Sequence, residues 1–572
     1  MKSYAIEAIF HEPNSRFAHA ISDTQIQVRL QTKKNDMTLI EVLFADVYNW
    51  ASVEGEYRWQ STTVPMTKRF SDEASDYYVA TLTVPSSRFK YAFVFDNTVL
   101  YGQLGMVEGP FTNNHVHNYF TFPYINKLDQ PHQPSWINGL TWYQIFVDRF
   151  ASTKPKLDWT TPSVTNQMIF GGNLQGIIEK LEYLSDLGIQ GLYLNPIFDS
   201  PTAHKYDTTD YYKIDPSFGN MDDLKELVAQ AHKRGIKVML DGVFNHAGYQ
   251  HAFFQDVIKQ EGNSEYVDYF LIDSFPIEKQ SASGYPSYRA FAYASNMPKW
   301  NTSNQLVIDY LSDIALYYAK EVQIDGWRMD VSEEPSRALW QAMNDKIRAV
   351  NPDFFMVAEN WYDANSWLSN RQFDSVMNYS YMFTLVDFFT NKIPASYVVN
   401  RLQQLLWRYP DLILHQLFNL IDTHDTARIK TLLPVHYNAV IGLIFAMPGT
   451  PSVYYGTEAG MVGENDPDCR RPMTWHAVDN EQHTLLKRLI QFRKHPVAQQ
   501  VEIQFWSEGE TIYFLKHHNE PLLGILSKEP LANIPLQYQT KHVFDIIQDK
   551  DIVLDKTMSI SNYIGLYLIK EQ

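Results

Sequence analysis

Four short apolar stretches of this chain each end in acidic, histidine or asparagine side chains. They are Asp241-Gly-Val-Phe-Asn-His246, Asp325-Gly-Trp-Arg-Met-Asp330, Val357-Ala-Glu-Asn360 and Phe418-Asn-Leu-Ile-Asp-Thr-His-Asp425. In a β-strand Arg328 and Asp330 would share one face, because side chains alternate with a period of two. A neighbouring cation lowers the pKa of a carboxylate and keeps it ionised. Alone, this pair indicates a structural ion pair; beside the other three stretches, it favours a nucleophile.

Three of these carboxylates are the residue types that glycoside cleavage needs. That reaction uses two carboxyl groups on either side of the scissile bond, one ionised and one protonated. Arg328 is expected to keep Asp330 ionised. Glu359 follows the apolar residues 354–357 and precedes a tryptophan, and an apolar setting raises the pKa of a carboxyl group. Asp425 is expected to hydrogen-bond the ring hydroxyls of a distorted sugar.

From Thr141 onward, apolar strands alternate with amphipathic helices. Eight runs are predicted to be strands: Thr141 to Phe146, Gly191 to Leu194, Gly235 to Leu240, Gly326 to Asp330, Phe354 to Glu359, Ser375 to Tyr379, Gln416 to Asp422 and Ser452 to Tyr455. Helical spacing of apolar residues predicts helices over Leu174–Leu187, Asp222–His232 and Leu485–Phe492. These units predict an α/β fold, a (β/α)8 TIM barrel with its chemistry where the strands end. A doubly wound open sheet is the alternative, although no glycine-rich nucleotide loop follows any strand.

Alternating patterns predict further β-structure at both ends of the chain. The predicted order is an N-terminal β-sandwich (1–125), a linker (126–138), the barrel (139–246 and 301–495), an inserted subdomain (247–300) after the third barrel strand, and a small C-terminal β-domain (496–572). The insertion is inferred because its length exceeds that of a plain strand-to-helix loop.

Composition limits the compartment and the partners. The net charge of −17 argues against nucleic acid or an anionic membrane as a partner. The single cysteine, Cys469, excludes an intrachain disulfide. The longest apolar run, Ala439 to Met447, is shorter than the ~20 residues of a spanning helix, and residues 1–10 lack the apolar run of a signal peptide. A cytoplasmic protein is therefore expected.

The four stretches resemble, in order, the four signature regions of the α-amylase superfamily, glycoside hydrolase family 13. Met297-Pro-Lys-Trp-Asn301 is similar to the fifth region of its neopullulanase, cyclomaltodextrinase and maltogenic amylase group. Gly449-Thr-Pro-Ser-Val-Tyr-Tyr-Gly456 and Asn465-Asp-Pro-Asp-Cys-Arg-Arg-Pro-Met473 fit the same group. The resemblance implies an N-terminal domain with the fold of a starch-binding module that mediates dimerisation, and therefore a homodimer.

The resemblance also implies a role for each matching residue. Asp330 becomes the nucleophile, Glu359 the acid and base, and Asp425 the residue that stabilises the transition state. The implied substrate-binding residues are Tyr206 beneath the sugar at the cleavage point, His246 and His424 on its hydroxyls, Arg328 beside the nucleophile, Asp466 and Arg470 at the neighbouring sugar, and Trp361 and Glu334 on the acceptor side. Cys469 lies inside a matching motif and is expected to pack, not to react.

The implied activity is that of a retaining α-glucan hydrolase with transfer to sugar acceptors as a side reaction. It would cleave α-1,4 bonds in cyclodextrins, maltodextrins, pullulan or starch, and α-1,6 cleavage stays open. An oligo-α-1,6-glucosidase or a sugar isomerase is the alternative enzyme, and an inactive sugar-binding homologue is the alternative outside catalysis.

The chain departs from the group at several places, among them Ile421-Asp-Thr423 and Thr457. After Asp330 the group usually reads Val-Ala-Asn-Glu, whereas this chain has Val331-Ser-Glu-Glu334. Members of the group often hold calcium near the first barrel strand, but Lys154 and Lys156 stand where acids are expected, and Asn173 replaces an aspartate. Calcium binds through several oxygens, many of them anionic. A lost calcium site, with no metal and no cofactor, is therefore expected.

Overall fold

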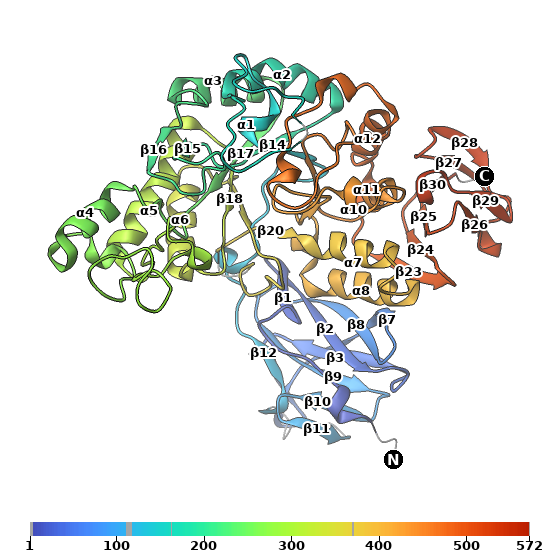
Figure 1. The fold of residues 1–572 in the computed structure, drawn as a ribbon. Coiled ribbons are helices and arrows are strands. Elements are labelled where there is room, and N and C mark those ends of the chain that lie inside the picture. Colours follow the sequence, from blue (N-terminus) through green and yellow to red (C-terminus); the bar gives the residue numbers. More distant parts are fainter. Residues whose placement is uncertain (1–3, 110–116, 162, 369–370, 571–572) are drawn as a thin grey trace. The chain divides into compact units, whose positions relative to one another are not determined.

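The computed structural model describes residues 4–109, 117–161, 163–368 and 371–570 (Figure 1). The chain forms two compact units. One contains Met1–Pro131 and Asn400–Leu412, and the other contains His132–Val399 and Ile413–Gln572.

The first unit is an antiparallel β-domain, as predicted. Its strands are β1 (Ala18–Ser22), β2 (Gln25–Lys33), β3 (Ile40–Ala45), β4 (Trp50–Val53), β5 (Glu56–Trp59), β6 (Thr62–Pro65), β7 (Thr67–Ser71), β8 (Ser75–Thr83), β9 (Phe89–Phe95), β10 (Val99–Gly102), β11 (Gly105–Glu108) and β12 (Phe120–Phe122). One sheet has the order β1-β2-β8-β7, the other has the order β11-β10-β9-β3-β6 with β12 beside β9, and β4 pairs with β5. Alternate residues of both sheets, among them Val28 and Phe93, enclose one apolar core.

Residues 400–412 join this unit although they lie far along the chain. Arg29 on β2 is fully buried. Its Nη1 donates to the carbonyl oxygens of Trp407 at 3.0 Å and Tyr409 at 3.1 Å, and its Nη2 contacts Asp411 Oδ1 at 3.2 Å. A buried guanidinium needs such partners, because an unpaired buried charge is costly.

The second unit contains a closed parallel barrel of eight strands, the predicted TIM barrel. The strands are β13 (Trp142–Ile145), β14 (Gly191–Leu194), β17 (Lys237–Gly242), β18 (Gly326–Met329), β19 (Phe355–Ala358), β20 (Ser375–Asn378), β21 (Phe418–Leu420) and β22 (Thr450–Tyr454). Each overlaps one predicted run. They read as short apolar runs because residues on both faces of a barrel strand are covered.

Helices cover the outside of the barrel (Figure 1). They are α1 (Val147–Phe150), α2 (Leu174–Leu187), α3 (Met221–Lys233), α5 (Gln305–Tyr317), α6 (Arg337–Arg348), α7 (Tyr379–Phe389), α10 (Ile429–Leu432), α11 (Tyr437–Ala446) and α12 (Glu481–Phe492). Two further helices, α8 (Ala395–Arg408) and α9 (Asp411–Leu414), include most of the residues 400–412 of the first unit. The starts of the barrel helices follow local chemistry: the Asn173 side chain caps α2, and Asn220 with Asp223 forms a capping box on α3. Among the described residues, no helix has the length and apolar content needed to cross a membrane.

Two insertions interrupt the barrel rhythm. A two-stranded ribbon, β15 (Phe198–Asp199) and β16 (Asp210–Ile214), lies between β14 and α3. After β17, residues 247–300 carry the helix α4 (Ala252–Gln260) and isolated bridges such as His246 with Lys299. The bridge ties the end of the insertion back to the residue that follows β17.

The C-terminal β-domain belongs to the same unit as the barrel. Its strands are β23 (Ile503–Glu508), β24 (Thr511–Lys516), β25 (Leu522–Ser527), β26 (Leu531–Asn533), β27 (His542–Asp545), β28 (Lys550–Val553), β29 (Thr557–Ser559) and β30 (Ile564–Ile569). Six form a sheet of order β23-β24-β25-β30-β27-β28, and β26 pairs with β29. At the other end of the unit, Ser135 and Trp136, inside the predicted linker, already hydrogen-bond to Asp353.

Candidate active site

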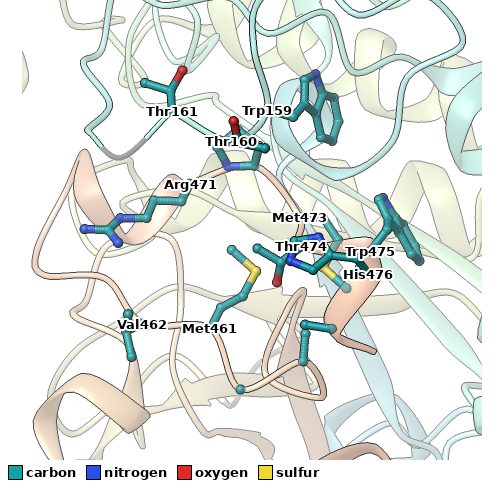
Figure 2. A pocket seen from close by; sticks show the side chains of 14 residues that line it. Trp159, Thr160, Thr161, Met461, Val462, Arg471, Met473, Thr474, Trp475 and His476 are labelled. Atoms are coloured by element: carbon teal, nitrogen blue, oxygen red, sulfur yellow. The ribbon is translucent and has the colours of Figure 1, made fainter. Parts of the chain in front are cut away.

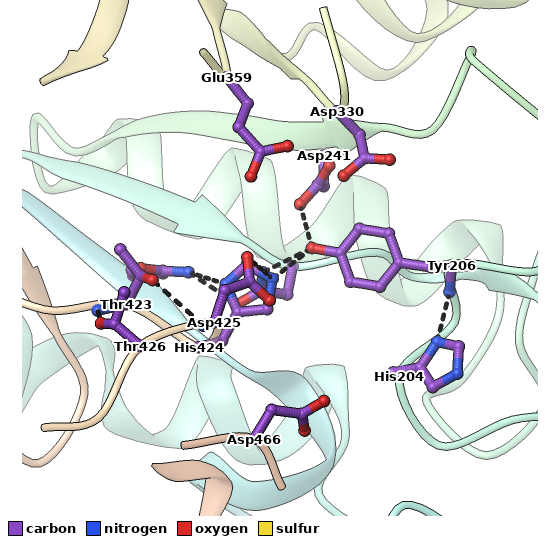
Figure 3. Close-up of polar contacts among 12 residues, drawn as sticks. His204, Tyr206, Asp241, Asp330, Glu359, Thr423, His424, Asp425, Thr426 and Asp466 are labelled. Carbon is purple, nitrogen blue, oxygen red and sulfur yellow. Dashed lines mark hydrogen bonds and ion pairs between the residues drawn. The ribbon is translucent and has the colours of Figure 1, made fainter. Parts of the chain in front are cut away.

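Arg328 stands at the centre of three carboxylates at the ends of neighbouring barrel strands. Its Nη1 donates to Asp241 Oδ1 at 2.8 Å and to Asp330 Oδ1 at 2.9 Å. Its Nη2 forms an ion pair with Glu359 Oε1 at 2.7 Å. The register of the strands brings these side chains together. Asp241 pairs directly with Arg328, and Glu359 follows the last residue of β19. Figure 3 shows the three carboxylates directed into one space.

Burial dominates the electrostatics of this cluster. It raises the pKa of Asp330 well above its usual range, and Arg328 opposes the shift without cancelling it. Burial likewise raises the pKa of Asp241 to about 6. Arg328 lowers the pKa of Asp330, as expected, but the expected net result was wrong: burial, helped by the charges of Glu359 and Asp241, outweighs the guanidinium. A cluster with more acids than cations retains a proton readily, which a site for acid catalysis requires.

Glu359 is not in the purely apolar setting predicted for it. Its Oε2 accepts the backbone N–H of Val331 at 3.0 Å, and its Oε1 faces the indole N–H of Trp361 at 3.3 Å. The apolar residues before it lie in the strand itself, and the side chain turns toward Arg328 at the strand end. Trp361 stacks on Tyr379 with ring centroids 4.2 Å apart.

A hydrogen-bonded chain joins Tyr206 and His424 to the carboxylates. Burial lowers the pKa of His424 well below its usual value, so the ring is neutral. The amide of Gln144 donates to His424 Nδ1 at 2.8 Å, which leaves the ring proton on Nε2. That nitrogen lies 2.5 Å from the Tyr206 hydroxyl, which donates to Asp241 Oδ2 at 3.0 Å. The chain fixes both rings beside the cluster (Figure 3).

Arg470 links Asp425 to Asp466. Its Nη2 contacts Asp425 Oδ1 at 3.1 Å, and its Nη1 contacts Asp466 Oδ1 at 2.8 Å. Both acids keep exposed side-chain surface, 28% for Asp425 and 37% for Asp466. The adjoining Cys469 is fully buried, its thiol contacts the His424 carbonyl oxygen at 3.0 Å, and burial raises its pKa to about 12.

His246 and Glu334 have protein partners of their own. His246 Nε2 donates to the Tyr206 carbonyl oxygen at 3.0 Å, and burial lowers the pKa of its ring to about 3. Its ring stacks on Phe291 of the insertion. Glu334, 41% exposed, pairs with Lys299 at 2.7 Å. Lys299 belongs to the Met-Pro-Lys motif, so the two motifs meet in space.

Three residues of this hydrogen-bond network were not predicted from the sequence to belong to the site: Gln144, Tyr193 and Asn195. Gln144 orients His424, and Tyr193 donates to Asp241 Oδ2 at 2.7 Å. Asn195 bonds to the Tyr206 hydroxyl at 3.3 Å. A position at the end of a predicted strand was the available signal, since β13 and β14 end at Ile145 and Leu194.

A separate pocket of about 700 Å³ lies apart from the carboxylates. Figure 2 shows Trp159, Met461 and Trp475 around it. Some of its polar groups are already bonded: the Thr160 and Thr161 hydroxyls donate to Asp158, and Arg471 pairs with Asp468. Thr474 and His476 also line the pocket, so it presents polar groups beside its indole and thioether surface.

No metal site stands out in the described parts of the chain. Within residues 4–109, 117–161, 163–368 and 371–570, no group of three or more His, Cys, Asp and Glu side chains is placed to hold a metal ion. In the loop expected to have lost calcium, Asn173 Oδ1 accepts the N–H of Gly176 at 2.7 Å, and Asn173 Nδ2 donates to Thr153 at 3.0 Å.

A closed (β/α)8 barrel with paired carboxylates at its strand ends defines the class of protein as a glycoside hydrolase. A model of the α-amylase catalytic domain matches residues 144–518, and a model of the α-amylase N-terminal Ig-like domain matches residues 4–126. The chain belongs to the α-amylase family and is a glycoside hydrolase of the cyclomaltodextrinase, maltogenic amylase and neopullulanase type.

Individual relatives cover nearly the whole chain. A cyclomaltodextrinase from Geobacillus thermopakistaniensis (strain MAS1) is 38% identical over 552 residues, which are 93% of this chain and 92% of the relative. Neopullulanase 2 from Thermoactinomyces vulgaris is 39% identical over 505 residues, which are 85% of this chain and 84% of the relative. A solved cyclomaltodextrinase structure superposes with a TM-score of 0.86 at 33% identity, covering 99% of this chain and 98% of that one.

Proposed function

We propose that this protein is a retaining α-glucan hydrolase that cleaves α-1,4 bonds of short or cyclic glucans. Asp330 is the nucleophile, Glu359 the acid and base, and Asp425 the residue that grips the distorted sugar. The observation that carries the proposal is the clustering of Asp241, Asp330 and Glu359 around Arg328.

The first half-reaction follows from that cluster. In the reactive state the proton of the cluster lies on Glu359, and Asp330 is ionised beside Arg328. An oxygen of the Asp330 carboxylate attacks C1 of the sugar while Glu359 gives its proton to the glycosidic oxygen, and the C1–O bond breaks. Positive charge develops at C1 in the transition state, and the negative cluster stabilises it. The products are a covalent glycosyl ester on Asp330 and a shortened glucan.

The second half-reaction releases the sugar. Glu359, now a carboxylate, removes a proton from water, which attacks C1 and displaces Asp330. Two inversions retain the α configuration. A sugar hydroxyl in place of water gives transfer as a side reaction, and we assign Glu334, which pairs with Lys299, to the binding of that acceptor.

Five residues bind the sugar at the cleavage point and its neighbour in this proposal. The faces of Tyr206 and His424 are fixed by their shared hydrogen bond, and Asp466 with Arg470 contacts the next sugar. His246 acts through the backbone of Tyr206 as well as through its ring. Trp361 lines the other side beside Glu359. A cytoplasmic location and a homodimer complete the proposal.

The product profile tests the function. Purified protein is incubated with β-cyclodextrin, pullulan, soluble starch and acarbose, and the products are separated by chromatography. We expect cyclodextrin to be opened and cut to maltose and glucose faster than starch is degraded. Hydrolysis of isomaltose or rearrangement of sucrose, without action on cyclodextrin, would instead support the α-1,6-glucosidase or isomerase.

A further inference from the structure

The residue after Asp330 has an unusual backbone. Val331 has φ of +47°, in the left-handed region. This region is unfavourable for a β-branched side chain, and such a conformation persists only where its surroundings hold it. The conformation directs the Val331 N–H at Glu359 Oε2, 3.0 Å away.

Ser332 holds this conformation in place. It is fully buried, and its hydroxyl donates to the carbonyl oxygen of Glu359 at 2.6 Å. Its backbone N–H donates to the same oxygen at 3.2 Å. The indole N–H of Trp340 on α6 donates to the Ser332 carbonyl oxygen at 2.9 Å, which anchors the segment to the barrel wall.

We propose that Ser332 is a positioning residue that, with the strained Val331 amide, fixes the orientation of the Glu359 carboxyl at the strand end beside Arg328. Three N–H and O–H groups of two successive residues fasten the backbone and the carboxyl of Glu359 at once. The inference rests on the proposed function, because it assigns Glu359 a proton to give.

The test compares two substrates with different needs for protonation. When the leaving group is a sugar, its oxygen needs a proton from the catalytic acid. Fluoride leaves α-maltosyl fluoride with little such help. We expect Ser332→Ala to lower kcat/KM for maltotriose about 10-fold, within the range that misplacement of an acid produces. For α-maltosyl fluoride, kcat/KM should change less than about 3-fold.

Two further variants separate positioning from general damage. Ser332→Thr keeps the hydroxyl and should restore most of the maltotriose activity. Ser312→Ala is the matched control: Ser312 on α5 is equally buried, its hydroxyl has no hydrogen-bond partner within the described residues, and the change should affect neither substrate. Equal losses of Ser332→Ala on both substrates, or no loss on either, would overturn the inference. Wild-type protein inactive on both would instead refute the proposed function.

Discussion

Asp330 is buried, shares its guanidinium partner with two other acids, and has a raised pKa. Asp330→Asn removes the nucleophile and keeps the shape of the side chain. We predict a loss of turnover of about 10⁴-fold or more, as for other enzymes stripped of a nucleophile. Calorimetry should show that maltotriose still binds with an affinity within about 10-fold, because its contacts with other residues remain. Normal turnover of this variant would exclude the assignment.

The positions of single site residues were predictable where the residue directly follows a predicted barrel strand. Asp330, Glu359 and His424 follow barrel strands, and strand ends meet at one rim. The simultaneous contact of Arg328 with three carboxylates was not predictable. It depends on the register between the strands β17, β18 and β19. The left-handed Val331 was equally hidden, since a backbone angle leaves no mark in the composition.

At the scale of elements, the strand β24 carries a fully buried lysine, Lys516. Lys516 has no exposed surface, its Nζ donates to the Ala498 carbonyl oxygen at 2.8 Å, and burial lowers its pKa well below the usual value. Arg493 also donates to that oxygen, at 2.7 Å. Loss of the lysine would therefore leave the acceptor satisfied.

Lys516→Met should stabilise the protein at neutral pH. The unfolded lysine titrates near 10.4, so between the lowered native pKa and that value the unfolded chain binds more protons. The free energy of unfolding therefore rises with pH, and the lysine costs most stability at low pH. We predict that the variant raises Tm at pH 7 by about 2–4 °C, with a smaller gain at pH 10. Lys541→Met, at an exposed position, is the control. A gain that grows toward pH 10 would contradict the argument.

The loop between α1 and α2 should not need calcium. The oxygen of Asn173 already caps α2, and the Lys156 N–H bonds to the Phe170 carbonyl oxygen at 2.9 Å. The loop keeps a single carboxylate, Asp158, which already accepts from Thr160, and it carries two lysines, so it offers few of the anionic ligands that calcium prefers. We predict that excess EDTA leaves activity unchanged and Tm within about 1 °C. A fall of several degrees that added calcium reverses would show that a site exists.

Elements were predicted well where the pattern is local. All eight barrel strands are apolar runs, and α2 begins and ends at its predicted residues because Asn173 caps it and Gly188 follows in a left-handed conformation. The ribbon of β15 and β16 was missed, since strands of two and five residues are too short to show a clear alternating pattern. The inclusion of residues 400–412 in the N-terminal unit rests on Arg29, and such a non-local contact has no periodic signal.

At the scale of the whole molecule, the N-terminal unit presents exposed aromatic side chains. Tyr48 is 72% exposed, Tyr57 is 73% exposed and Trp50 is 39% exposed, around the hairpin of β4 and β5. Clustered exposed aromatics are typical of interaction surfaces. We predict that the hairpin contacts a second subunit and narrows its active site, which favours small glucans over starch.

Light scattering on the intact protein tests the assembly. We expect a species of twice the 66.5 kDa chain mass at micromolar concentration. Tyr48→Ser/Tyr57→Ser should shift it toward monomer and raise the ratio of starch to cyclodextrin activity. These substitutions are preferable to deletion of the N-terminal domain, because deletion would remove the partners of Trp407. A wild-type monomer would rule out this role for the hairpin.

The anomer released at the start of hydrolysis tests the central claim most directly. A proton NMR time course is recorded on maltotriose with wild-type protein, before mutarotation mixes the anomers. Double displacement at Asp330 predicts that the α-anomeric signal appears first and the β signal follows slowly. An initial β signal would contradict the assignment of Asp330 as nucleophile and of Glu359 as the acid and base.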